Sequence, residues 1–289
     1  MAELKEIKSR LQSVRSTQKI TSAMMMVSSA KLQKTQHIIR DLYPYEQKLY
    51  YLLQLLLSQQ EEFVSPFVRQ RPVGRVAIVA FSSNSSLAGR FNDDISDKLQ
   101  AVVESYRHLG NENIHIYPIG EKVAKVTRNL GLKAQHNFSD ISEKPAYKNT
   151  QTIADELTNM FLDKSIDRVE LIYHHFRSKG SQVVLHEPYL PVNLKSDKKE
   201  IATEEYIIEP DSTSILNELL PKVLRLKLYT VHIDSVTSEH AARMKAMQIA
   251  TDNADNLIED LKLEYNKLRQ ESITNELLDI IGGSFGRSG

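Results

Sequence analysis

The chain has 289 residues, enough for one good-sized hydrophobic core or for a core with an appendage. Its 37 Lys and Arg residues balance 37 Asp and Glu residues, so bulk charge indicates no polyanionic partner. The absence of cysteine excludes disulfides and thiolate metal sites, and the absence of tryptophan argues against a nucleic-acid stacking surface. The N-terminus carries no apolar h-region, and no apolar run approaches the ~20 residues of a membrane span. We therefore expect no signal or transit peptide and no direct transmembrane insertion.

The distribution of glycine and proline predicts a long N-terminal helix over residues 1–65. Residues 1–43 contain neither, Pro44 interrupts the pattern, and residues 45–65 again contain neither. Such stretches exceed the ~11–12 residues of an average globular helix. The stripe of apolar residues that this helix would present drifts along its length: Ile7, Leu11, Val14, Ile20, Met24, Val27, Leu32 and Ile39.

Three consecutive methionines, Met24, Met25 and Met26, cover most of the circumference of this predicted helix. One intramolecular seam can bury only part of that surface, and methionine suits adaptable contacts. Either two of the three face the seam and one packs elsewhere, or the group contacts an external partner. We favour the external partner, because Met244 and Met247 add further methionines from the other end of the chain.

Residues 73–210 change character and predict an α/β domain. β-rich segments at 75–81, 113–118 and 168–174 alternate with helical patterns near 92–109, 120–130 and 150–164. This alternation predicts a mostly parallel, Rossmann-like sheet with helices packed on it. A last β-like section follows at 182–208, with a charged loop at Lys195–Glu205.

Three polar motifs contain residue types that could serve in a chemical site. Residues 82–90 follow the first strand, where open α/β sheets bind ligands, but they lack a phosphate-binding glycine pattern, so a structural turn is preferred. His174 and His175 are adjacent on a strand and therefore face opposite sides, and no further metal-ligand spacing accompanies them. Asp93 and Asp94 suit the first turn of a helix. We expect no catalytic residue, metal site or cofactor; Asp252 is interpreted as a solvated or partner-facing residue.

A second long helix is predicted over residues 212–285, with Gly282 and Gly283 as its stop. A 3,4 spacing marks an apolar seam, and a shifted stripe continues it. Residues 1–40 carry more basic than acidic side chains, and residues 238–285 carry more acidic than basic ones. The two ends of the chain are therefore expected to pair as an antiparallel coiled coil. The seam and its shifted stripe comprise Met244, Met247, Thr251, Ala254, Ile258, Leu261, Tyr265 and Leu268, then Ile273, Leu277 and Ile280.

These two ends resemble the gamma subunit of F-type ATP synthases, the central rotor stalk. The N-terminal resemblance lies in Ile7-Lys-Ser-Arg-Leu-Gln-Ser-Val14 and in Thr17-Gln-Lys-Ile-Thr-Ser-Ala-Met24. The C-terminal resemblance includes Ala241-Ala-Arg-Met244 and Ala250-Thr-Asp-Asn-Ala254. Together with shorter matches they cover about a third of the chain. The α/β middle also looks like that family's globular domain, but is less distinctive.

The resemblance implies a non-catalytic shaft that couples rotation of a membrane c-ring to conformational cycling of catalytic beta subunits. Its partners would be three alpha and three beta subunits, the epsilon subunit and the c-ring, on the cytoplasmic face of a bacterial inner membrane. It implies no nucleic-acid partner. The residues expected to contact partner subunits are Met24, Met25, Met26, Lys31, Arg243, Met247, Arg269, Gln270, Thr274 and Glu276.

Two other classes of protein share some of these sequence features. An α/β enzyme carrying a coiled-coil arm would need a phosphate loop or clustered catalytic residues within 75–210, and neither is apparent. An RNA-binding protein would use the basic N-terminal helix, but an acidic partner helix is available for those charges. Strong salt-sensitive RNA binding would favour that second alternative.

Overall fold

The computed structural model describes residues 2–58, 65–136, 138–192, 209 and 211–285. The predicted charged loop at Lys195–Glu205 lies outside these residues. Contacts divide the chain into two compact units: unit 1, residues 1–28 and 244–289, and unit 2, residues 29–243. The two long helices, α1 (Ala2–Ser58) and α6 (Ser212–Phe285), each contribute to both units. The domain boundaries expected from the sequence lie near the ends of these helices, whereas the boundary between the two units lies within them.

Two predicted interruptions of the long helices are wrong. α1 continues through Pro44, and α6 contains Pro221 and passes Gly282 and Gly283 before it ends at Phe285. A proline removes one backbone hydrogen bond and can kink a helix without ending it, and glycine only lowers helix propensity. Local signals of this size are overridden when the flanking turns are held by packing, as α1 is at the buried Leu53 beyond Pro44.

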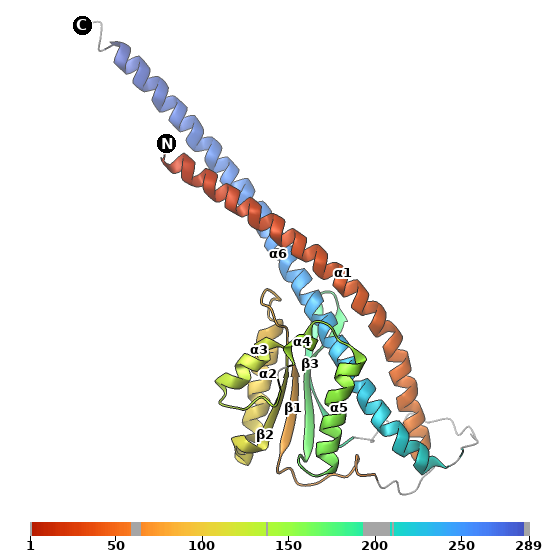
Figure 1. Ribbon diagram of the computed structural model, residues 1–289. Helices are drawn as coiled ribbons and strands as arrows, with labels where there is room; N and C mark the ends of the chain where they lie inside the picture. The colour runs from red at the N-terminus through yellow and green to blue at the C-terminus, as the bar shows by residue number, and fades with distance from the viewer. Residues whose placement is uncertain (1, 59–64, 137, 193–208, 210, 286–289) are drawn as a thin grey trace. The chain divides into compact units, whose positions relative to one another are not determined.

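The predicted mostly parallel sheet is confirmed. Its four strands are β1 (Val76–Phe81), β2 (Ile114–Ile119), β3 (Arg168–Ser178) and β4 (Ser181–Leu190), in the order β2-β1-β3-β4 (Figure 1). β1 pairs in parallel with β2 and with β3, and β4 closes one edge as the antiparallel arm of a hairpin. The predicted β-like section at 182–208 corresponds, in its described part, to β4, which ends at Leu190.

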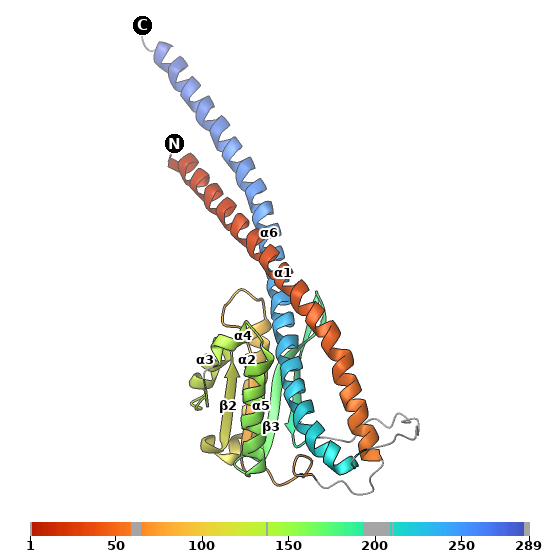
Figure 2. The ribbon, with the colours of Figure 1, turned by 45° about the vertical axis from the view of Figure 1, so that its right-hand side comes forward.

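Helices cover both faces of this sheet within unit 2 (Figure 2). One face packs against α2 (Phe91–Tyr106) and α3 (Glu121–Asn129). The other packs against α5 (Tyr147–Leu162) and the first part of α6, with α1 contributing Leu53 and Leu56. Every residue of β1 is buried, which explains its continuous apolar run. The remaining short elements are the 3₁₀ turns at Arg107–Leu109 and Asn111–Asn113 and α4 (Ser139–Ser142).

Gly120 joins β2 to α3 at a point where the backbones of two strand ends meet. Its φ is +111°, and a Cβ there would lie 2.2 Å from the Ser82 backbone oxygen. Gly120→Ala is therefore expected to lower the free energy of unfolding by about 3 kcal/mol, measured by urea denaturation. Gly131→Ala is the matched control, because Gly131 also has a positive φ but has open space around it. We expect that control to cost about 1 kcal/mol; equal losses would contradict the steric explanation.

Candidate functional site

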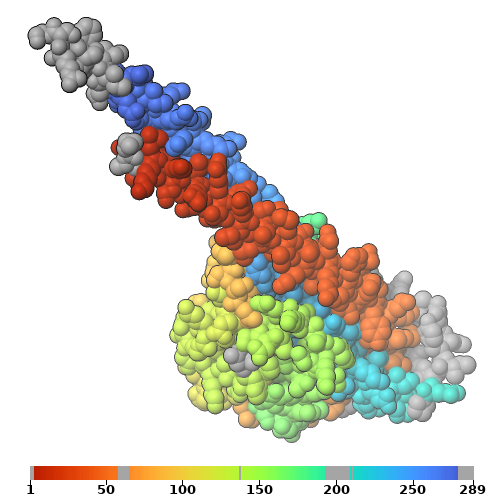
Figure 3. Space-filling model, turned by 45° about the horizontal axis from the view of Figure 1, so that its top comes forward, coloured from red at the N-terminus to blue at the C-terminus, as the bar shows by residue number. Residues whose placement is uncertain are grey.

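The paired ends of the two long helices form unit 1. Within it, the N-terminal part of α1 runs beside the C-terminal part of α6 (Figure 3). Thr21 lies opposite Thr251 and Gln18 opposite Asp255, so rising numbers on one helix meet falling numbers on the other. The helices are therefore antiparallel, as predicted. The predicted α6 seam is also confirmed: Met247, Thr251, Ala254, Ile258 and Leu261 are buried, and Met244, Tyr265 and Leu268 are half-buried.

The seam of α1 differs from the predicted stripe. Ile20 and Val27, which were assigned to it, are 60% and 57% exposed. The buried positions of the segment instead keep a regular 3,4 spacing that includes Thr21 and Ser28. The stripe in the sequence drifts because polar residues occupy these seam positions, while apolar residues stand beside them on the surface.

A hydrogen bond between two threonine hydroxyls lies inside this seam. The Oγ1 atoms of Thr21 and Thr251 are 2.8 Å apart, and either hydroxyl can donate to the other. Thr251 Oγ1 also lies 2.9 Å from the Met247 carbonyl oxygen, which can accept its proton instead. Each threonine is about nine-tenths buried. Each hydroxyl also lies within hydrogen-bond distance of a backbone carbonyl oxygen of its own helix, so neither depends on the other helix for a partner.

The eight lysine and arginine residues among residues 1–40 lie at the surface of α1. All eight of them are exposed: Lys5, Lys8, Arg10, Arg15, Lys19, Lys31, Lys34 and Arg40. Exposed charges of this kind contribute little to stability, because solvent screens them. Apolar contacts along the seam join the two helices, together with a hydrogen bond between the Thr21 and Thr251 hydroxyls and one from Gln18 to Asp255.

The residues predicted to contact partner subunits fall into two groups. Most are accessible: Met26 is 60% exposed, Met24 and Met25 are half-buried, and Lys31, Arg269, Gln270, Thr274 and Glu276 are exposed. Met247 and Arg243 require correction. Met247 is 4% exposed in the seam, and Arg243 is committed to contacts within the chain, so neither presents a free side chain to a partner.

Further exposed apolar residues add to this surface; those from Ile273 onward lie in the segment 273–281 that the family resemblance also implied would turn within an apolar sleeve, whereas the others were not expected as contacts. In unit 1 these exposed side chains include Ile20, Val27, Ile249, Leu257, Leu263, Ile273, Leu277 and Leu278. The predicted shifted stripe is thus solvent-facing at Ile273 and Leu277, and the Ile280 side chain lies outside the described ones. In the sequence, exposed residues such as Ile20, Val27 and Leu263 can be recognised because they are apolar but lie off the 3,4 spacing of the helix seam.

In unit 2, α6 carries a polar segment that is buried on every side. Residues 230–241 are all buried, although most of them are polar. Arg243 follows this segment by two residues. It donates from Nη1 to Glu239 Oε1, within the segment, at 2.6 Å, and from Nη2 to Ser85 Oγ at 2.8 Å. The Glu239 side chain is 2% exposed and that of Arg243 11%. Burial raises the pKa of Glu239, and Arg243 opposes this rise.

Three histidines in unit 2 are held neutral by burial. Burial lowers the pKa of His174, His232 and His240 to about 4 in each case. His174 stacks on Phe91 with ring centroids 4.3 Å apart, and His232 packs near Phe81. The nearby cations Lys31 and Arg243 lower the pKa of His240 further.

The expected opposite orientation of His174 and His175 is confirmed. His174 is buried against α2, whereas His175 Nδ1 lies 2.7 Å from Asp234 Oδ2 on α6. Among the described residues, no group of three or more His, Asp or Glu side chains is placed to hold a metal ion. Asp94 pairs with Arg90 in the first turn of α2, and the exposed Asp252 accepts from Gln248, so neither belongs to a two-carboxylate site.

The turn at residues 82–90 is occupied by hydrogen bonds within the chain. Ser82 Oγ accepts from the Val123 N–H at 2.9 Å, and Ser83 Oγ lies 2.6 Å from the Ser85 carbonyl oxygen. Asn84 donates to the Ser139 carbonyl oxygen and accepts from the Glu121 N–H. These bonds join the end of β1 to α3 and α4, which agrees with a structural turn.

Known proteins match this chain along nearly its whole length. A family model described as ATP synthase matches residues 3–285. The chain is 51% identical to the ATP synthase gamma chain of Phocaeicola vulgatus, over 98% of this chain and 99% of that protein. It is 50% identical to that of Bacteroides thetaiotaomicron, with the same coverage, and 40% identical to that of Flavobacterium johnsoniae over the full length of both.

Solved structures share the fold. A chain from the Euglena gracilis mitochondrial ATP synthase, described as OSCP/F1/c-ring in rotational state 3, superposes with a TM-score of 0.68 at 17% identity. The match covers 99% of this chain and 94% of that one. A chain from the central stalk/c-ring structure of the Tetrahymena thermophila enzyme gives a TM-score of 0.56 at 22% identity, covering 80% and 99%.

Proposed function

The chain belongs to the ATP synthase gamma chain family, and we propose that it acts there as a rotating shaft with no catalytic centre of its own. The observation that carries this proposal is the exposed apolar surface on the paired helices of unit 1, where Ile20 and Met26 are each 60% exposed. Such residues on a long helix pair suit repeated sliding contacts within an apolar sleeve.

The proposed partners follow the family. Three alpha and three beta subunits would surround the helix pair, and the epsilon subunit and c-ring would meet other parts of the chain. The complex would lie on the cytoplasmic face of a bacterial inner membrane, with this chain as a peripheral subunit. No helix within the described part of the chain is long and apolar enough to cross a membrane.

The contacts to the catalytic head are proposed to use the accessible part of the predicted set. Arg269, Gln270, Thr274 and Glu276 are exposed on α6 and can reach polar groups on a surrounding subunit. Thr274 Oγ1 donates to the Gln270 carbonyl oxygen within the helix, and its oxygen can still accept a bond. Lys31 and the three methionines would contribute from α1.

Reconstitution tests this proposal. The full chain is mixed with its cognate alpha and beta subunits, the complex is isolated by size exclusion, and ATP hydrolysis is measured. We expect one copy per six head subunits and no hydrolysis by the chain alone. Replacing the exposed apolar residues of α1 in the variant Ile20→Gln/Met26→Gln/Val27→Thr should lower hydrolysis or incorporation by about tenfold or more.

The matched control changes exposed apolar residues of unit 2 instead. Leu87 and Leu162 are 58% and 40% exposed, and the variant Leu87→Gln/Leu162→Gln should leave hydrolysis by the head complex unchanged. Failure of the wild-type chain to incorporate, or hydrolysis by the chain alone, would contradict the shaft proposal. Equal losses in both variants would show that the effect does not depend on the helix pair.

A further inference from the structure

The end of the β3–β4 hairpin extends beyond the sheet of unit 2. β1 pairs with β3 as far as Ile172, and among the described strands the remaining part of β3 pairs with β4 alone. Residues 175–183, here called the strap, form the outer end of this ribbon, with His175 paired to Val183 at its base. A two-stranded ribbon is only marginally stable by itself in water. The strap therefore depends on its contacts with other elements.

Apolar packing ends where the strap begins. Tyr173 and Leu185 pack into the core on the α5 side of the sheet, and Val184 packs into the core on the α2 side. Among the residues that the structure describes, neither core includes a member of the strap. Every strap residue is half-buried or exposed. Hydrophobic burial therefore contributes little to holding the strap in place.

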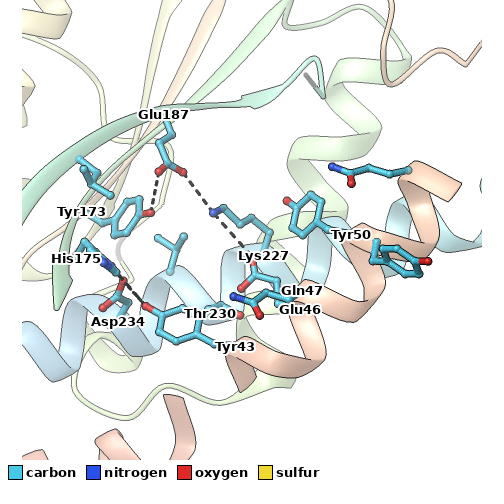
Figure 4. Close-up of a pocket in the computed structure, with 14 residues that line it drawn as sticks. Tyr43, Glu46, Gln47, Tyr50, Tyr173, His175, Glu187, Lys227, Thr230 and Asp234 are labelled. Atoms are coloured by element: carbon cyan, nitrogen blue, oxygen red, sulfur yellow. Dashed lines mark hydrogen bonds and ion pairs between the residues drawn. The ribbon is translucent and has the colours of Figure 1, made fainter. Parts of the chain in front are cut away.

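Asp234 of α6 supplies polar contacts that fix the strap. Its Oδ1 accepts from the Phe176 N–H at 2.8 Å, and its Oδ2 lies 2.7 Å from His175 Nδ1. The same Oδ2 accepts from the Tyr43 hydroxyl of α1 at 2.9 Å (Figure 4). The Asp234 side chain is only 3% exposed. One buried carboxylate thus joins the strap to both long helices within unit 2.

The carboxylate depends on these donors in turn. A buried carboxylate that loses its hydrogen-bond partners destabilises the folded chain. Burial raises the pKa of Asp234, and the contacts from His175, Phe176 and Tyr43 oppose that rise. Two of these three donors belong to the strap. The strap and the carboxylate therefore stabilise each other, and losing either one weakens the closed arrangement.

The part of α6 that the strap contacts is polar. Asp234 belongs to the buried polar segment 230–241. About one turn further along α6, Ser238 Oγ donates to the His174 carbonyl oxygen next to the strap. Water can replace hydrogen bonds of this kind when two elements separate, whereas apolar contacts would have to expose their surface. Regions with few buried apolar contacts open at a lower free energy than the core.

We propose that the strap is a conformational device: it opens away from α6 as a local unit, with Asp234 as its latch, while the sheet stays folded. Opening gives the Asp234 carboxylate access to water and removes one restraint on α6. The inference goes beyond the proposed function, because it rests on contacts within unit 2 and does not involve the helix pair of unit 1. It holds or fails whether or not the chain turns inside a catalytic head.

Hydrogen–deuterium exchange of the purified full chain, measured at single residues and over a series of urea concentrations below the unfolding transition, tests the opening. The reporter is the Phe176 amide, which donates to Asp234. The reference is the set of β1 amides at Val76–Phe81, in the buried centre of the sheet. We expect the protection factor of Phe176 to be at least about tenfold lower than those of β1, with a weaker urea dependence, because local opening exposes little surface. Equal protection and equal urea dependence would overturn the proposal.

Matched histidine variants test the latch. His175→Phe removes a contact to Asp234 and should lower the protection factor of Phe176 by about tenfold. Its control is His186→Phe on β4, because the His175 and His186 side chains are 34% and 30% exposed and each contacts a buried carboxylate. The partner of His186 is Glu170, which lies within the same hairpin, so this contact stays intact when the strap opens. His186→Phe should therefore leave the protection of Phe176 unchanged.

Asp234→Asn is the second variant, because it keeps the shape of the side chain and removes its charge. It should also lower the protection factor of Phe176 by about tenfold. If this buried variant fails to fold, His175→Phe keeps the test decisive, since His175 lies partly in solvent. Circular dichroism confirms that each variant is folded before exchange is measured. Unchanged protection in a folded His175→Phe, or equal losses in His175→Phe and His186→Phe, would refute the role of Asp234 as a latch.

Discussion

Lowering the pH from 7 to 5 is expected to reduce the free energy of unfolding through three buried histidines. The pKa of His174, His232 and His240 is about 4 in the folded chain, whereas histidine in an unfolded chain titrates near ~6.5. Between these two values the unfolded chain binds protons that the folded chain does not. The stabilising contribution is therefore complete above pH ~6.5 and is lost as the pH falls toward 4. Each histidine should contribute a loss of roughly 2 kcal/mol at pH 5.

Buried carboxyl groups act in the opposite direction. Burial raises the pKa of Glu46, Asp234 and Glu239, so the folded chain binds their protons more readily and gains stability as the pH falls. The net pH dependence therefore does not isolate the histidines. A variant that removes a single imidazole is needed.

His174→Phe provides that variant, because an aromatic ring is kept against Phe91 and only the titration is removed. Urea denaturation of wild type and variant is compared at pH 8 and at pH 5. At pH 8 the difference reports packing alone, since the imidazole is neutral in both states. The variant should lose about 2 kcal/mol less than wild type on going to pH 5. Identical losses would show that His174 is not held neutral.

Arg243→Met is expected to lower the free energy of unfolding by about 3 kcal/mol, because it leaves the buried Glu239 carboxylate without its cation. The pair is separated by four residues on α6, at 2.6 Å, and Glu239 is 2% exposed. Lys222→Met is the matched control on the same helix. Its partner Glu218 also lies four residues before it, but the pair is 3.5 Å apart and well exposed. That control should cost less than ~1 kcal/mol.

Two further measurements separate charge from packing at Arg243. The double variant Glu239→Gln/Arg243→Met removes both charges and should recover much of the lost stability. The deficit of Arg243→Met should also shrink at lower pH. Glu239 then takes up a proton more readily in the folded chain, since its pKa is raised, and a neutral acid no longer needs the cation. A deficit that is equal at pH 8 and pH 5 would contradict this explanation.

The fold could be predicted from the sequence where each element carries its own signal. The fully apolar run at Val76–Phe81 identifies a strand buried on both faces, and the regular spacing of Met247, Ala254 and Ile258 identifies a helix seam. The seam of α1 could not be predicted in detail, because Thr21 is buried there with the Gln18 carbonyl oxygen and the Thr251 hydroxyl as hydrogen-bond partners of its own hydroxyl, while Ile20 remains exposed. Hydrophobicity cannot reveal a polar residue that is buried because other groups of the chain supply its hydrogen bonds.

The candidate sites show the same limit. The exposed positions of Arg269 and Gln270 agree with the motif-based expectation, although contact with a partner remains a proposal. Arg243 belongs to an equally good motif, yet it pairs with Glu239 and reaches Ser85 across more than a hundred residues of sequence.

The boundary between the two units falls inside both long helices, at residues 28/29 and 243/244, and this restricts which changes of chain length the protein can tolerate. Successive residues of an α-helix are rotated by about 100° about the helix axis. Within unit 1, deleting one residue of α1 between Ile7 and Thr21 would therefore turn one of these two buried residues away from the seam. Surface loops tolerate changes of length more readily, but the paired helices of unit 1 should accept them only in whole heptads, made in both helices at once. Related chains of different length are thus expected to differ in the loops and not in the paired helices.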